Sequence, residues 1–250
     1  MRLFDSHTHI DMKHFQNDID RVIQRAREAD LIGMVTSSIG SGSFRRTIGI
    51  IKKYPNFIYH SAGCSVSQLT EDETTKIIEL IQKYSKDIVA VGEVGLDYHW
   101  IKDSRGRKAQ EPLFSKFIEL AIELNLPIVI HSRKAEERAT EMLEKQFSGD
   151  VLMHCFDGAP EIARRVADNG WYITLPSNFD KYRNRIASAK ILPLDHILLE
   201  TDGPYLSPTP LRNEPANIRH GCEALSKVLK LSMEDVAKAT TNNAEQFYRL

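Results

Sequence analysis

The sequence has 250 residues, of which 42% are hydrophobic and 27% are charged, and its formal net charge is −1 at pH 7. This length suits one α/β barrel with one large core, and the balanced charge excludes a surface that attracts nucleic acid or anionic membranes as a whole. Three widely spaced cysteines, Cys64, Cys155 and Cys222, are typical of a reducing compartment and not of a disulfide framework. With no apolar stretch that could span a bilayer and no signal peptide at the start, we expect a cytoplasmic protein without a membrane partner.

Short apolar runs alternate with helical patterns along the chain. Apolar runs of this length, bounded by turn residues or polar helices, are typical of buried parallel strands. In chain order, the predicted strands are Leu3–Ser6, Gly33–Ser37, Phe57–Ala62, Val89–Glu93, Ile128–His131, Val151–His154, Trp171–Leu175 and Ile197–Glu200. The predicted helices are Asn17–Ala29, Phe44–Tyr54, Glu71–Tyr84, Gln110–Leu124, Ala135–Phe147, Pro160–Asn169, Tyr182–Ala189, Asn217–Leu229 and Ser232–Leu250. Strict alternation indicates a parallel sheet with right-handed crossovers.

Eight strand–helix units favour closure into a TIM (β/α)8 barrel, with two extra helices at the C-terminal end. The alternative is an open doubly wound sheet, whose site would lie at the one crevice where the strand order reverses. The chain shows no linker or low-complexity segment, so we expect residues 1–250 to form a single domain.

Potential metal ligands stand at the ends of five predicted strands. They are His7, His9, Glu93, His131, His154 and Asp202. Because the carboxyl ends of barrel strands meet at one face, these side chains are expected to share one site. Residues i and i+2 of a strand face the same way, so His7 and His9 can bind one ion. A lone pair of this kind is as often two polar loop residues, but ligands at further strand ends favour a metal site.

Four histidines and two carboxylates exceed the needs of one tetrahedral ion and suit two divalent ions about 3.5–4 Å apart. The first ion would take His7, His9, Glu93 and Asp202, and the second Glu93, His131 and His154. A carboxylate such as Glu93 is costly to bury alone and would join the two ions, although pairing with Arg or Lys is an alternative. Asp202 would act as general base toward metal-activated water, or it only begins the turn before Gly-Pro. This donor set is compatible with zinc, manganese or magnesium, and the sequence does not decide among them.

Several short motifs resemble those of one known family. They are Phe4-Asp5-Ser6-His7-Thr8-His9, Gly92-Glu93-Val94-Gly95-Leu96-Asp97-Tyr98-His99, Leu126-Pro127-Ile128-Val129-Ile130-His131-Ser132-Arg133, His154-Cys155-Phe156-Asp157-Gly158, Glu200-Thr201-Asp202-Gly203-Pro204-Tyr205-Leu206 and Arg212-Asn213-Glu214-Pro215. In this order the chain resembles, nearly end to end, the TatD family of metal-dependent deoxyribonucleases, a branch of the amidohydrolase-like barrels. The resemblance implies a TIM barrel, a two-metal centre at the six residues above with catalytic Asp202 and Glu93, and phosphodiester hydrolysis of DNA.

Two positions depart from that family's pattern. After the third strand, the usual Gly-x-His-Pro-His segment reads Gly63-Cys64-Ser65-Val66-Ser67, and Lys134 stands where Asp usually follows the Ser-Arg pair. Neither change removes a metal ligand, but both lie on loops that are expected to face the substrate. The physiological substrate therefore stays open, with single-stranded DNA, a DNA 3′ end or another small phosphodiester as the expected partner.

Candidate substrate contacts are Arg133, Tyr98 and Tyr205. Arg133 could bind a phosphate through two hydrogen bonds, or it could pair with Glu214 and hold that loop. Basic residues also gather in the predicted loops 100–108 and 178–185 and at Arg45 and Arg46, beside the aromatic residues Trp100, Phe179 and Tyr182. Solvated surfaces explain most charge runs, but aromatic residues among them favour single-stranded nucleic acid.

Three functions compete. The first is a two-metal phosphodiesterase or deoxyribonuclease, and the second is an amide, ester or lactone hydrolase on the same centre. Many such barrels bridge their ions with a carbamylated lysine, and Glu93 in that place favours the first function. The third is a non-catalytic metal-holding scaffold, against which the retention of all six ligands argues. The oligomeric state is not indicated.

Overall fold

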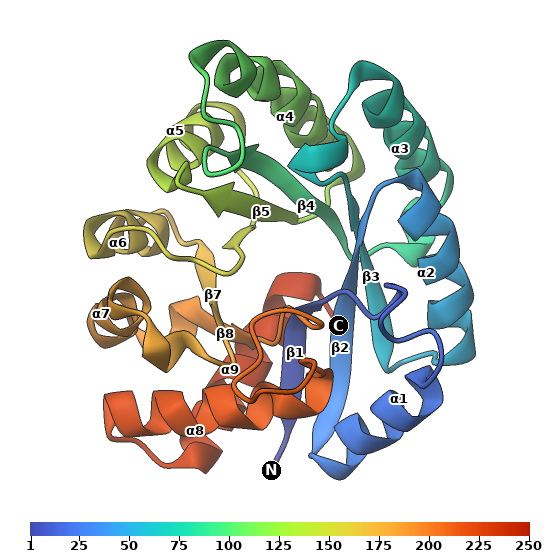
Figure 1. Ribbon diagram of the computed structural model, residues 1–250. Helices are drawn as coiled ribbons and strands as arrows, with labels where there is room; N and C mark the ends of the chain where they lie inside the picture. Colours follow the sequence, from blue (N-terminus) through green and yellow to red (C-terminus); the bar gives the residue numbers. More distant parts are fainter.

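The computed structural model describes residues 1–250 and contains one eight-stranded sheet whose strands follow one another in sequence order. Each neighbouring pair from β1 to β8 is parallel. The strands are β1 (Leu3–Thr8), β2 (Leu31–Ile39), β3 (Ile58–Gly63), β4 (Ala90–Asp97), β5 (Ile128–Arg133), β6 (Val151–Met153), β7 (Tyr172–Pro176) and β8 (Ile197–Glu200). Figure 1 shows them inside a ring of helices.

Backbone hydrogen bonds join the last strand to the first just beyond the end of β8. The amide of Asp202 donates to the His7 carbonyl at 2.9 Å, and the amide of His9 donates to the Gly203 carbonyl at 2.8 Å. These bonds bring the two ends of the sheet together, so the predicted TIM barrel is confirmed and the open doubly wound sheet is wrong.

The helices cover the outside of the barrel. They are α1 (Ile19–Glu28), α2 (Ser41–Lys53), α3 (Glu71–Lys83), α4 (Ser104–Leu124), α5 (Glu136–Gln146), α6 (Pro160–Asp168), α7 (Arg183–Ile191), α8 (Ile218–Leu229) and α9 (Met233–Tyr248). Five short 3-10 helices complete the chain, at Val66–Gln68, Ser85–Asp87, Phe179–Lys181, Leu194–His196 and Pro215–Asn217. None of the helices is both long and apolar enough to cross a membrane.

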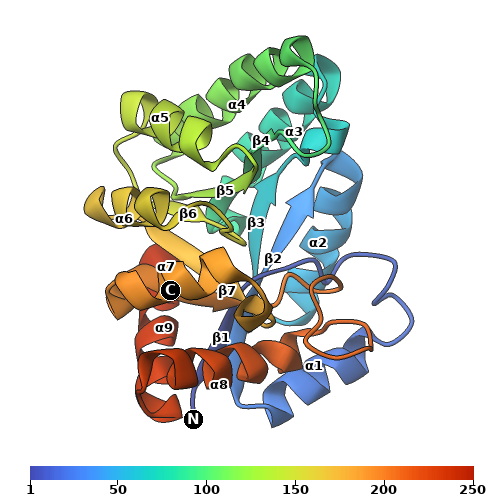
Figure 2. The ribbon, with the colours of Figure 1, turned by 60° about the vertical axis from the view of Figure 1, so that its left-hand side comes forward.

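Two apolar cores follow from the alternation of side chains along the strands. The outer core of 49 buried residues fills the layer between strands and helices. The inner core holds inward-facing strand residues such as Phe4, Val129 and Leu198 together with Phe247 and Tyr248 of α9. Helix α9 packs against β1 and β8, and Figure 2 shows it beside β1. The final helix thus fills one end of the barrel and leaves the opposite end, where the strands finish, for the site.

Helix α4 begins at Ser104, six residues before the predicted start at Gln110. Asp103 caps it, because its side chain accepts a hydrogen bond from the Gly106 amide at 2.7 Å. The prediction that 100–108 is a loop is therefore wrong beyond Asp103, and the basic residues from Arg105 onward lie on a helix.

A buried histidine on β3 makes the fold sensitive to acid. His60 is fully buried, and its Nε2 lies 2.8 Å from the Ser38 hydroxyl, whereas its Nδ1 has no partner. Burial penalises the charged ring and lowers the pKa of His60 from 6.5 to about 3.

Acid should therefore lower the free energy of unfolding through His60. A depressed folded pKa contributes stability that is fully present above pH 6.5 and is lost as the pH falls toward 3. Between pH 7 and pH 5 the wild type should lose about 2 kcal/mol more than His60→Gln, whose amide can keep the bond to Ser38. Denaturant unfolding of both proteins in chelator at the two pH values measures this difference, and equal losses would contradict the assignment.

Candidate metal centre

The six predicted ligands converge around one carboxylate at the carboxyl ends of the strands. Oε2 of Glu93 lies 2.9 Å from His7 Nε2, 3.7 Å from His9 Nε2 and 3.3 Å from His154 Nε2. Its other oxygen, Oε1, lies 3.9 Å from His131 Nδ1. Glu93 thus contacts imidazoles that come from β1, β5 and the end of β6.

Asp202 completes the cluster from the segment that follows β8. Its Oδ1 lies 3.3 Å from His9 Nε2 and 4.0 Å from His7 Nε2. The backbone bond from its amide to His7 fixes this approach. Three ligand sets have atoms within 4.8 Å of one another, and they are His7–His154–Asp202, His7–His9–Glu93 and Glu93–His131–His154.

Two glycines of β4 allow Glu93 to reach this position. Gly92 and Gly95 have φ angles of 148° and 145°, which L side chains rarely adopt. A Cβ atom on Gly92 would lie 2.5 Å from the Val129 carbonyl, and one on Gly95 would lie 2.2 Å from the His131 carbonyl. The two glycines therefore bring β4 close to β5, and Glu93 close to His131.

The negative charges of Glu93 and Asp202 must be balanced by positive charges nearby. Burial alone would raise the pKa of Glu93, yet His154, His7 and His9 hold it well below its usual range. Burial alone would lower the pKa of His9, but its bond to Asp202 and the charge of Glu93 raise it to about 10. Ionised carboxylates in a buried pocket thus draw positive charge to themselves.

The donor set fits divalent cations. Both ring nitrogens of His7 and Oε2 of Glu93 are buried without a hydrogen bond of good geometry. Buried polar atoms are rarely left in this state, and imidazole nitrogens with carboxylate oxygens are common ligands of zinc and manganese. His7 Nε2 and Glu93 Oε2 lie 2.9 Å apart at the middle of the cluster, where an ion could bind both.

Polar partners behind the histidines set their orientation. His9 Nδ1 lies 2.8 Å from the Ser37 carbonyl, so its Nε2 faces the cluster. Asp97 Oδ2 lies 3.0 Å from His131 Nε2, and Glu200 Oε2 lies 3.5 Å from His154 Nδ1. A carboxylate behind a metal-binding imidazole fixes its tautomer and raises its basicity.

Reasoning from the sequence assigned no role to Asp97 or Glu200. Both are buried, and Glu200 also accepts a hydrogen bond from the Thr174 hydroxyl at 2.5 Å. Each stands near a ligand in the chain but serves a histidine of another strand. For Glu200, the acidic residue at the end of an apolar run was the feature of the sequence that could have indicated a buried functional carboxylate.

The predicted substrate contacts lie around the cluster at different distances. Tyr205 is about half exposed, and its ring centroid is 6.4 Å from that of His9. Tyr98 lies deeper in the loop after β4, under the guanidinium of Arg107. Arg133 ends β5 and is exposed beside Trp100.

The alternative pairing of Arg133 with Glu214 is wrong. Glu214 binds Arg25 through two hydrogen bonds of 2.7 and 2.6 Å. This pair joins the loop before α8 to α1, and Arg133 stays free of it.

Part of the predicted basic and aromatic surface is also wrong. Phe179 is fully buried in the outer core, so no base can stack on it. Arg185 is 5% exposed and faces Asp157 at 3.5 Å, and Arg46 binds Asp11 at 3.0 Å. Both arginines already face a carboxylate of the protein.

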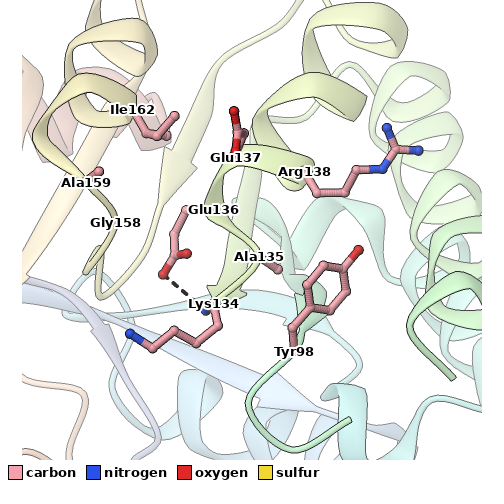
Figure 3. A pocket seen from close by; sticks show the side chains of 9 residues that line it. All are labelled: Tyr98, Lys134, Ala135, Glu136, Glu137, Arg138, Gly158, Ala159 and Ile162. Atoms are coloured by element: carbon pink, nitrogen blue, oxygen red, sulfur yellow. Dashed lines mark hydrogen bonds between the residues drawn. The ribbon is translucent and has the colours of Figure 1, made fainter. Parts of the chain in front are cut away.

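A cavity of about 300 Å³ lies at the loops after β4, β5 and β6, and none of the six candidate ligands lines it. Figure 3 shows Tyr98 and Lys134 on it, with the side chain of Lys134 extending away from the tyrosine ring. The Lys134 amide donates to Glu136 at 3.2 Å, while its ammonium forms no ion pair. Lys134, one of the two unusual positions, thus faces a space that a substrate could enter.

The comparisons with known proteins agree with this geometry. The model of the TatD related DNase family matches residues 4–249. The uncharacterized metal-dependent hydrolase YabD of Bacillus subtilis (strain 168) is 33% identical over 258 residues, which cover 99% of each chain. Deoxyribonuclease TATDN3 of Homo sapiens is 31% identical over 258 residues, which cover 98% of this chain and 94% of that one. The crystal structure of YJJV, a TatD homolog from Escherichia coli k12, has the same fold, with a TM-score of 0.88 and 22% identity over 99% of this chain and 98% of that one.

Glu200→Gln should weaken the affinity for divalent metal about 10–100-fold, because the neutral amide no longer supports His154 as a basic ligand. Competition with a chromophoric chelator measures the affinity. The matched control is Glu223→Gln, an exposed position of α8 that pairs with Lys227 at 2.7 Å, and it should bind metal as the wild type does. Equal affinity in both variants would show that Glu200 does not act through His154.

Proposed function

The chain belongs to the family of TatD-related DNases, which makes it a metal-dependent hydrolase, and we propose that it hydrolyses phosphodiester bonds of DNA at a centre of two divalent ions. The observation that carries the proposal is the position of Glu93. Its two oxygens face different imidazoles, with His7, His9 and His154 near Oε2 and His131 near Oε1. A carboxylate shared in this way suits two neighbouring ions better than one.

The proposed ions share Glu93 as a ligand. The first would be held by His7, His9, Glu93 and Asp202, and the second by Glu93, His131 and His154. Magnesium, manganese and zinc are all compatible with this donor set. When bound, such ions lower the pKa of water and neutralise charge on phosphate oxygens.

Asp202 is the proposed general base. Its Oδ1 faces His9 and His7, while its Oδ2 forms no hydrogen bond or ion pair with the protein. Oδ2 can therefore accept the proton of an attacking water molecule while Oδ1 keeps the carboxylate in place. Cys155 is no rival nucleophile, because burial raises the pKa of its thiol well above the usual range.

DNA is the proposed substrate, in single-stranded form or at a 3′ end. The human relative named deoxyribonuclease supports this choice. Arg133 would bind a phosphate, and Tyr205 and Tyr98 would contact the substrate near the centre and in the adjoining cavity. We propose further that residues 1–250 act as one hydrolase domain in the cytoplasm, where the three free cysteines stay reduced.

Turnover should disappear in chelator and return with added magnesium, manganese or zinc, because the site offers no other hydrolytic group. A panel with a single-stranded oligonucleotide, a small phosphodiester reporter and a set of carboxylic esters measures it. Cleavage of the phosphodiesters is the expected result. Hydrolysis of esters alone would favour the amide, ester or lactone hydrolase, and full turnover by demonstrably metal-free protein would refute metal dependence.

Asp202→Asn should lower kcat about 10²–10⁴-fold with little change in KM, because asparagine keeps the shape but cannot accept the proton. Metal content must be measured on the same sample, since lost metal mimics lost catalysis. Asp195→Asn is the matched control, because that carboxylate is exposed at the opposite end of β8. Near-normal kcat in a fully loaded Asp202→Asn protein would show that Asp202 is not the base.

A further inference from the structure

Trp100 is an exposed tryptophan beside the candidate metal centre. Its side chain is 70% exposed, whereas Trp171, the second tryptophan of the chain, is 6% exposed. Tryptophan is highly buried on average in folded proteins. An exposed tryptophan ring at the mouth of the barrel therefore indicates a surface that binds a ligand. The ring of His99 lies edge-on at 4.9 Å and leaves most of the indole open.

The backbone, and not the indole, holds Trp100 in place. Asp97 Oδ1 accepts hydrogen bonds from the amides of His99 and Trp100, each at 2.8 Å. The other oxygen of Asp97 faces His131 at 3.0 Å. One carboxylate therefore ties the Trp100 turn to a proposed metal ligand, which places the largely exposed indole next to the centre.

Arg133 supplies a positive charge at the same place. Its guanidinium lies 5.5 Å from the centroid of the Trp100 ring. The two residues are brought together by the pairing of β4 with β5, where Asp97 stands opposite Arg133 and the Tyr98 amide donates to the Arg133 carbonyl at 2.9 Å. Their contact thus follows from the sheet register.

The guanidinium of Arg133 has no acidic partner. It forms no ion pair and no side-chain hydrogen bond. In contrast, Arg46 binds Asp11, Arg212 binds Asp18, and Arg25 binds Glu214. These three arginines are paired with carboxylates, whereas the five N–H donors of Arg133 remain available to a ligand.

We propose that Trp100 and Arg133 form a nucleotide shelf, on which an unpaired base stacks on the indole while an adjacent phosphate binds the guanidinium. The proposal rests on the proposed function and names the two residues that would recognise its unpaired substrate. An open π-face with a fork of donors matches a base and its phosphate. A base inside a duplex has both faces covered by its neighbours, so the shelf selects single strands and unpaired ends.

Direct binding in chelator, where the metal-dependent reaction is stopped, tests the shelf. The probes are a short oligothymidylate, an abasic oligomer with the same number of phosphates, and a blunt duplex of two complementary strands, whose binding should not depend on Trp100. The readout is tryptophan fluorescence together with anisotropy of a labelled probe. Oligothymidylate should quench the wild-type emission in a saturable way, and this quenching should be absent in Trp100→Phe, which retains the buried Trp171.

Trp100→Ala should lose about 5–150-fold in affinity for oligothymidylate, which corresponds to 1–3 kcal/mol for one stacked base. Trp100→Phe should keep most of the affinity, because phenylalanine also stacks. Neither variant should change binding of the abasic oligomer. Arg133→Gln should weaken both oligomers and reduce the slope of log affinity against log salt by about 0.7, the value for one phosphate contact on a single strand.

Two controls remove comparable groups far from the shelf. Ile122→Ala removes an exposed apolar side chain near the C-terminal end of α4, and Lys52→Gln removes an exposed charge near the C-terminal end of α2. Both should bind all probes as the wild type does.

The possible outcomes separate the shelf from the proposed function. If the metal-loaded wild type cleaves oligothymidylate but Trp100→Ala binds it normally, the shelf is overturned and the function stands. If the wild type binds single strands through Trp100 but cleaves none, the shelf stands and the function fails. Equal losses for the abasic and base-bearing oligomers, or a wild type that binds neither, would overturn stacking. Self-association of the wild type that Trp100→Ala abolishes would assign the indole to a second copy of the chain and also overturn it.

Discussion

The structure depends on one buried carboxylate, that of Glu93, whose negative charge needs a neighbouring positive charge. Glu93 lies at the middle of the strand ends, and its charge is tolerable only among groups that carry positive charge. In the structure the imidazoles take this role, because Glu93 and Glu200 raise the pKa of His154 to about 9 against the effect of burial. Divalent ions would replace those protons, so metal binding releases protons and weakens in acid.

The same residues close the barrel and build the centre. The hydrogen bonds that join the ends of the sheet start or finish at His7, His9 and Asp202. Beneath them, Asp5 binds the amide and hydroxyl of Thr201 at 2.8 and 2.5 Å. A change that loosens the seam between β1 and β8 therefore moves ligands, and a bound cation would in turn strengthen the seam. Stability and catalysis are coupled here through shared atoms.

Much of the fold and the position of the candidate ligands could be predicted from the sequence, because each depends on a local pattern. Apolar runs mark buried strands, and a polar residue at the end of such a run lands at the rim of the barrel. The remaining features depend on contacts between distant segments. Asp97 faces His131 only through the β4–β5 register, and Arg185 turns inward because Asp157 of another loop receives it. Charge runs do not reveal which arginines are already paired, which is why Arg46 and Arg133 looked alike.

The end of the barrel opposite the centre is filled by the last helix, and this has a consequence for biosynthesis. Phe247 and Tyr248 complete the inner core around Phe4, and the Tyr248 hydroxyl donates to the Ser6 carbonyl at 2.8 Å. The first strand, which carries His7, thus makes its contacts with α9 only after α9 has been synthesised. During translation the nascent barrel lacks its plug, and its open end exposes apolar surface that chaperones recognise.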